Sequence, residues 1–159
     1  MLVKAISPYG EGAAPPPLAA AAFKGNDRIV EQLLARVTDP NVMDATGKAA
    51  ITYAAARGFA GIVGRLLDAG VDAKFRYGND LTALMWAAGH EDGVGASAAV
   101  AVVELLIERG AAIDAADNRG RTALMIAAER GDAAVAETLA MTRRSRLQLL
   151  RVDQAKSWK

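Results

Sequence analysis

Residues 117–128 read Asp-Asn-Arg-Gly-Arg-Thr-Ala-Leu-Met-Ile-Ala-Ala, and this stretch decides the fold. Asp-Asn-Arg-Gly has turn chemistry, because Asp and Asn side chains bond nearby backbone and Gly tolerates positive φ. Thr122 then stands where a helix N-cap belongs. Leu124, Ala127 and Ala128 follow at helical spacing and share one face. Because two of these three residues are alanine, the face predicts a helix that another helix approaches closely.

The same pattern recurs upstream at residues 79–88, at 44–55 and, in its most eroded form, at 16–22. Its anchors, separated by 33, 33 and 40 residues, are Pro16, Ala49, Thr82 and Thr122. A second apolar run follows each first helix, and Gly70 and Gly110 stand where glycine naturally follows a helix C-terminus. The chain therefore predicts four units, each made of a turn and two helices.

A period of 33 residues with a turn and two helices per unit resembles the ankyrin repeat. The resemblance covers roughly residues 11–149. It implies an all-α solenoid of four helix-turn-helix units with short β-turn or hairpin loops. Where the family usually reads Thr-Pro-Leu-His, this chain reads Thr-Ala-Leu-Met at 82–85 and 122–125. The usual Thr–His hydrogen bond is therefore absent, and we expect each Met to fill that space as an apolar plug.

We expect a single domain over residues 1–159. Its expected parts are a lead-in at 1–10, repeats at about 11–43, 44–76, 77–116 and 117–149, and a basic tail at 150–159. Repeat three carries seven extra residues, which predict a loop at 89–97 between its helices, at the end opposite the turns. Ser97 is expected to cap the helix that follows. Residues 132–151 are expected to form the last helix together with an irregular cap over the apolar flank.

The composition narrows the class of protein. The chain is 52% hydrophobic but only 5% aromatic, which suits closely packed helices rich in alanine and branched aliphatic residues. A formal charge of +1 favours neither nucleic acid nor membrane as a partner. The absence of cysteine excludes disulfides and Cys-based metal sites. No apolar run approaches the length of a membrane span, so a cytoplasmic location is expected.

Few residues suggest catalysis or the binding of a metal or cofactor. Residues 93–98 read G-x-G-x-x-A, but a helix rather than a buried strand precedes them, which favours a flexible loop over a dinucleotide site. His90 is the only histidine and is followed by Glu91 and Asp92. A metal needs three or four converging ligands, so we interpret His90 as an exposed loop residue. No serine stands beside a plausible base. The sequence predicts no enzyme, no metal and no cofactor.

Two further features leave alternatives open. Residues 143–159 hold six Arg or Lys and one Asp, a charge of +5, which suits weak contact with nucleic-acid phosphate but favours a solvated helix end. Phe75, Tyr77 and Trp86 cluster around the third turn. Trp86 suits a binding role and packing between repeats equally well, whereas for Tyr77 exposure is favoured.

The resemblance implies protein binding through a concave groove lined by the turns and the first helices. The candidate partner-binding residues are Lys48, Arg57, Arg76, Tyr77, Asn79, Leu81, Trp86, Asn118, Arg119, Arg121, Glu129 and Arg130. Because five of them are arginine, we expect a basic face and an acidic protein partner. The alternative is a regulatory subunit or detached module that gates an enzyme. We expect a monomer with no membrane partner, and we disfavour nucleic acid.

Overall fold

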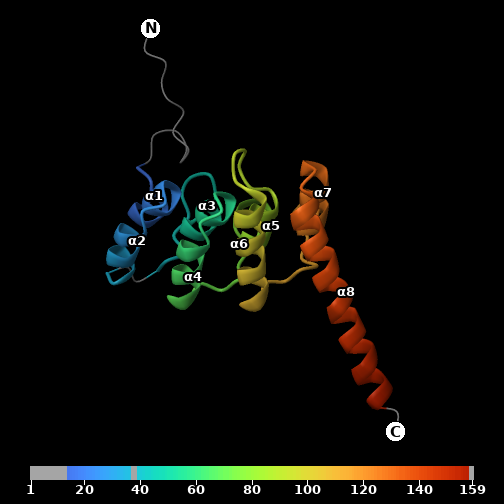
Figure 1. Ribbon diagram of the computed structural model, residues 1–159. Helices are drawn as coiled ribbons and strands as arrows, with labels where there is room; N and C mark the ends of the chain where they lie inside the picture. Colours follow the sequence, from blue (N-terminus) through green and yellow to red (C-terminus); the bar gives the residue numbers. More distant parts are fainter. Residues whose placement is uncertain (1–13, 37–38, 158–159) are drawn as a thin grey trace.

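The computed structural model describes residues 14–36 and 39–157, so the expected lead-in at 1–10 lies outside the described residues. Within the described residues the helices come in four consecutive pairs: α1 (Pro17–Lys24) and α2 (Asp27–Leu34), α3 (Ala50–Ala56) and α4 (Ala60–Asp68), α5 (Ala83–Ala88) and α6 (Ala96–Glu108), α7 (Ala123–Arg130) and α8 (Ala133–Lys156). A short 3₁₀ turn, η1 (Gly78–Asp80), precedes α5. Figure 1 shows the pairs side by side in chain order. The predicted all-α repeat solenoid is confirmed.

Threonine hydroxyls fix the starts of three first helices. Thr82 and Thr122 are N-caps, and each Oγ1 accepts a hydrogen bond at 3.3 Å from the amide three residues along. The predicted cap at Thr122 is therefore confirmed. In α3 the N-cap is Ala49, which has no hydroxyl; instead Thr52 Oγ1 accepts a bond at 3.0 Å from the Ala49 amide. In α3 the amide of the N-cap residue itself is therefore satisfied, by a side chain from the end of the first turn.

The first helices supply most of the small side chains of the core, and the second layer supplies mainly larger aliphatic ones. The first helices α1, α3, α5 and α7 contact one another in series, and α2, α4, α6 and α8 form the second layer. Ala54 and Ala55 in α3 and Ala87 and Ala88 in α5 are fully buried, so these backbones approach closely. The second layer supplies larger aliphatic groups such as Leu66. Each fully buried aliphatic side chain contributes about 1.5–3 kcal/mol before chain entropy is subtracted.

Exposed ion pairs join successive repeats on the side of the second layer, from the helices or from the turns that follow them. The pairs are Asp27–Arg65 at 3.1 Å, Asp68–Arg109 at 2.7 Å and Asp114–Arg143 at 2.8 Å. Their side chains are partly or largely exposed, so each pair contributes about 0–1 kcal/mol. They set the register of neighbouring repeats more than they stabilise the stack.

The inserted segment of repeat three lies at the end of the helices opposite the turns, as predicted (Figure 1). Gly89 is the C-cap of α5 and Gly95 is the N-cap of α6. Ser97 therefore lies inside α6 rather than capping it, and that expectation is wrong. Gly95 takes the cap because its extended backbone, with φ −67° and ψ 146°, immediately precedes the first helical residue.

The terminal repeat leaves its outer flank open. Met85 is 2% exposed, as expected for an apolar plug, whereas Met125 is 50% exposed because no further helix packs beyond α7 among the described residues. The expected irregular cap is also wrong, because α8 runs without interruption over 24 residues. Its sequence offers no Gly or Pro and is rich in Ala, Leu, Arg and Gln, all of which favour helix.

Candidate functional site

Aspartate carboxylates organise two of the hairpin turns that precede the first helices. Asp117 Oδ1 accepts hydrogen bonds at 2.9 Å from the backbone amides of Arg119 and Arg121. Asp44 Oδ1 bonds the two equivalent amides of its own turn at 2.8 and 3.2 Å. The backbone bond from Arg121 is the main reason why the pKa of Asp117 lies below its usual value. Both turns are therefore fixed in one conformation around a charged carboxylate.

The turn of repeat three is built differently, because Tyr77 occupies the position of those aspartates. Its Asn79 and Asp80 are both in the left-handed region, with φ of 60° and 59°. In the other two turns glycine stands where Asp80 does, namely Gly47 and Gly120. Left-handed backbone costs energy for any residue with a side chain. The third turn is thus strained at two exposed residues.

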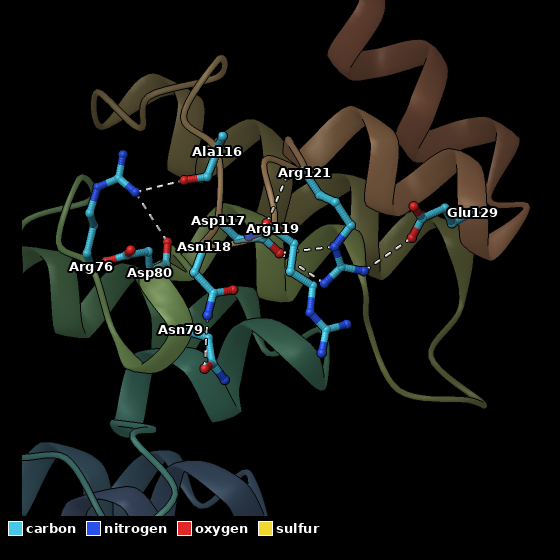
Figure 2. Close-up of polar contacts among 9 residues, drawn as sticks. All are labelled: Arg76, Asn79, Asp80, Ala116, Asp117, Asn118, Arg119, Arg121 and Glu129. Atoms are coloured by element: carbon cyan, nitrogen blue, oxygen red, sulfur yellow. Dashed lines mark hydrogen bonds and ion pairs between the residues drawn. The ribbon is translucent and has the colours of Figure 1, made fainter.

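Hydrogen bonds join neighbouring turns into one edge. The Gly78 amide donates to the Gly47 carbonyl at 2.9 Å, and the Asn118 amide donates to the Asn79 carbonyl at 3.0 Å. Asn118 Nδ2 also donates to Asn79 Oδ1 at 3.3 Å, so the two side chains lie in register (Figure 2). The turns of repeats two, three and four form a continuous ribbon rather than three independent loops.

Arg76 strengthens the same edge from its outer side. Its Nη1 donates to the carbonyl of Ala116 at 2.8 Å and to the carbonyl of Asp80 at 3.4 Å (Figure 2). Both acceptors are uncharged backbone groups, so the guanidinium charge is not neutralised by a carboxylate there. Arg76 thus links repeat three to repeat four and remains exposed.

Arg121 is held by two carboxylates. Its Nε lies 3.0 Å from Asp117 Oδ2 and its Nη1 lies 3.2 Å from Glu129 Oε2 (Figure 2). Asp117 comes from the turn and Glu129 from α7, so the arginine ties the turn to its own helix. The hydrogen bond to Asp117 is also the main reason why the pKa of Arg121 is raised.

Arg119 is the exposed arginine at the tip of this turn. Within residues 14–36 and 39–157, its guanidinium makes no hydrogen bond or ion pair, and in Figure 2 it ends without a dashed line. Its backbone amide is nevertheless fixed by Asp117 at 2.9 Å. The geometry therefore presents an available cation on a rigid support.

Two of the predicted arginines lie near the inserted loop and are already paired. Arg57 Nη1 lies 3.1 Å from Glu91 Oε2, and its guanidinium carbon lies 4.4 Å from the centroid of the Phe23 ring. Arg130 Nη2 lies 2.8 Å from Asp92 Oδ1. Both pairs tie a first helix to the insertion, and they leave the predicted face less basic than its count of arginines suggests.

Tyr77 is 4% exposed, so its expected exposure is wrong. Its ring centroid lies 4.8 Å from that of Phe75, and its hydroxyl donates to Asn41 Oδ1 at 3.1 Å. The neighbouring Leu81 is half-buried and accepts the Tyr77 amide bond at 2.9 Å. Burial, the largest cause, raises the pKa of the Tyr77 hydroxyl far above its usual value. Tyr77 therefore packs inside the third repeat and supports its turn.

Trp86 is half-buried, so it both packs between repeats and keeps part of its ring accessible. Lys48 Nζ lies 5.0 Å from the centroid of its ring and 5.4 Å from that of Tyr53. The Tyr53 hydroxyl in turn donates to Asp44 Oδ2. Sequence reasoning missed Tyr53 and Asp44 as supports of Lys48, although their spacing of nine residues places a turn and its own helix together.

His90 is buried, so its expected place on an exposed loop is wrong. Its Nε2 lies 2.6 Å from Asp132 Oδ2 and its Nδ1 lies 3.0 Å from the Glu91 carbonyl oxygen. Each ring nitrogen therefore faces an acceptor oxygen. The hydrogen bond from His90 is the main reason why the pKa of Asp132 is lowered. Asp132 is also the N-cap of α8, so this pair joins the insertion to repeat four.

Within residues 14–36 and 39–157, no group of three or more His, Asp or Glu is placed to hold a metal ion. In the same residues, no helix is long and apolar enough to cross a membrane. The structure brings the candidates of the turns together along one edge and leaves Arg57 and Arg130 at the insertion.

These features define a helical repeat protein with a preformed edge of turns. A family model described as "Ankyrin repeats (3 copies)" matches residues 18–96, and one described as "Ankyrin repeats (many copies)" matches residues 94–140. The chain belongs to the ankyrin-repeat family. Ankyrin repeats are generally non-catalytic modules of protein–protein interaction. Comparison with curated proteins finds no match.

Proposed function

We propose that this chain binds a protein partner through the edge of its turns, and that the bound segment of the partner is acidic. The finger surface is defined as Lys48, Arg76, Asn79, Asn118, Arg119 and Arg121. These residues come from the turns of repeats two, three and four. Trp86 lies beside Lys48 and adds a half-buried aromatic side chain next to the finger surface.

Rigidity of the finger surface supports the proposal. The backbone bonds from Gly78 to Gly47 and from Asn118 to Asn79 fix the turns before any partner arrives. The Asp117 carboxylate adds two more bonds within the fourth turn. A surface that is ordered in advance loses little entropy on binding, so more of the contact energy contributes to affinity.

The preference for an acidic partner rests on one observation, the state of the Arg119 side chain. Its guanidinium is unpaired within the described residues, whereas Arg121 beside it is bonded to Asp117 and Glu129. An arginine can engage a carboxylate through two parallel hydrogen bonds. A partner carboxylate opposite Arg119 gains that contact without breaking an existing pair, which is not true of Arg121, Arg57 or Arg130.

The test is affinity capture from a native lysate with quantitative mass spectrometry. Wild type is compared with Arg119→Glu, Arg119→Lys and the control Arg28→Glu. Arg28 is exposed on α2, in the second layer away from the turns. We expect Arg119→Glu to lose the main partner, Arg119→Lys to weaken it and Arg28→Glu to retain it.

If wild type and Arg119→Glu recover the same proteins equally, with unchanged helicity, the proposal that the finger surface binds the partner is wrong. If the captured partner is an enzyme, its activity is then measured with and without the purified chain. A change in rate at saturating chain identifies a regulatory subunit, whereas an unchanged rate identifies a scaffold.

A further inference from the structure

The second half of α8 leaves the stack. Val135 and Leu139, in the first half, are fully buried against the neighbouring helices. From Arg143 onward every described residue of the helix is exposed. Figure 1 shows α8 continuing well past the ends of α2, α4 and α6. We name residues 143–156 the α8 extension.

The α8 extension exposes large apolar side chains. Leu147, Leu149, Leu150 and Val152 are between 49% and 66% exposed. At about 100° per residue, Leu147 and Leu150 lie on one stripe and Leu149 and Val152 lie on the opposite stripe. The helix therefore has two apolar faces rather than one, and the side chains of both are exposed among the described residues.

Arginine side chains lie on both sides of the helix between the two apolar stripes. The α8 extension holds five Arg or Lys and one Asp, a charge of +4. Arg143 is paired with Asp114 at 2.8 Å. Arg144 and Arg151 lie on one side between the stripes, and Arg146 lies on the other side, where Asp153 also lies. Arg143 and Lys156 fall on the stripes themselves. None of Arg144, Arg146 and Arg151 makes an ion pair with a described residue.

We propose that the α8 extension is a second docking element, which inserts into the cleft of a partner protein with apolar walls and acidic rims. A helix with apolar residues on two opposite faces buries both only when it is enclosed from two sides. The cations between those faces then meet the rims, where carboxylates complement them. This element is separate from the finger surface and does not depend on it.

Other occupants fit the same residues less well. A flat membrane surface covers one face of a helix and leaves the opposite stripe in water. A second copy of the chain brings another +4 against the first, so the two extensions repel. Nucleic acid suits the arginines but gives no reason for four exposed aliphatic side chains.

The test uses a synthetic helical-hairpin probe whose cleft is lined by leucine and rimmed by glutamate, titrated by fluorescence anisotropy. One variant replaces the first stripe, Leu147→Gln/Leu150→Gln, and another the second, Leu149→Gln/Val152→Gln. The charge variant is Arg144→Glu/Arg151→Glu, and the control on the same helix is Gln148→Ala. We expect each stripe variant and the charge variant to weaken binding about tenfold or more, while the control stays within about twofold.

Far-ultraviolet circular dichroism of every variant establishes that α8 remains helical. Parallel measurements use vesicles with anionic lipid, a single-stranded oligonucleotide, and light scattering of the chain alone. The proposal is overturned by the absence of probe binding, by dependence on one stripe only, or by vesicles, oligonucleotide or self-association outcompeting the probe. Because Arg119→Glu leaves the α8 extension intact, probe binding by that variant separates this proposal from the finger surface.

Discussion

Removal of either partner of the His90–Asp132 pair is expected to destabilise the fold strongly. The two side chains are 7% and 11% exposed and lie 2.6 Å apart, so breaking the pair leaves a buried polar group without its partner. Breaking such a pair costs about 3–5 kcal/mol. His90 keeps its contact with the Glu91 carbonyl when Asp132 is replaced, so we expect the lower end of that range.

A double-mutant cycle measures the interaction itself. Asp132 is also the N-cap of α8, and its Oδ1 accepts a bond from the Val135 amide at 3.1 Å. Asp132→Ser keeps a capping oxygen, whereas Asp132→Ala loses about 1 kcal/mol more through the cap. The cycle therefore uses His90→Ala, Asp132→Ser and the double variant. We expect a coupling energy of about 1–3 kcal/mol in urea unfolding followed by circular dichroism.

The exposed pair Asp68–Arg109 serves as the reference. Its atoms lie 2.7 Å apart, nearly the same distance, but its side chains are 68% and 40% exposed. Solvent screening predicts a coupling of about 0–1 kcal/mol there. If the His90–Asp132 cycle gives a coupling no larger than this reference, burial does not strengthen the pair and the reasoning fails.

The remaining predictions concern the stability of one helix, the stability of two turns and the dependence of stability on pH. Gly64→Ala should stabilise α4 by about 0.5–1 kcal/mol, because its new Cβ meets only Leu105 Cδ2 at an ordinary 3.7 Å; a lower melting temperature would contradict this. Asp80→Gly should raise the stability of the protein, because Asp80 has a φ of 59° that glycine adopts without strain. Gly47→Ala should lower the stability by about 1 kcal/mol or more, because a Cβ at Gly47 meets backbone at 2.8 Å. Equal melting temperatures of wild type and both variants would refute the strain assigned to these turns. The pKa of Asp132 is lowered in the fold, so the stability that its carboxylate contributes is complete above about pH 4 and is lost as pH falls further. In acid titrations, Asp132→Ser should therefore lose less stability than wild type between neutral and low pH.

The stack itself could be predicted from the sequence because its signals are local. The alanine pairs and the threonine caps each arise from residues a few positions apart, and the same local pattern recurs after 33 residues. Thr122 and the amide it caps are separated by three residues, so the residue types alone define that contact. The same holds for the place of the inserted loop between α5 and α6.

Side-chain exposure at the site could not be predicted because it depends on distant partners. Tyr77 is buried through Asn41, 36 residues away, and His90 through Asp132, 42 residues away. The pairing of Arg130 with Asp92 spans 38 residues. A single sequence shows these residues as polar groups near turns, but only the packing of one repeat on the next decides which become paired.

The continuation of α8 could have been predicted from the sequence. From Asp132 onward the chain has no glycine or proline among the described residues, and its leucine, arginine, glutamine and alanine all favour helix. Expecting a cap there relied on the general need of terminal repeats to cover an apolar flank. In this chain Met125 and Met141 remain exposed, and the helix extends past the stack instead.

Hydrogen–deuterium exchange of the chain with and without its captured partner tests the central claim most directly. The account predicts that binding protects the amides of the three turns, at 44–48, 77–82 and 117–122, together with the first turn of α5 and α7. Protection confined to the outward faces of α2, α4 and α6, with the turns unchanged, would contradict it.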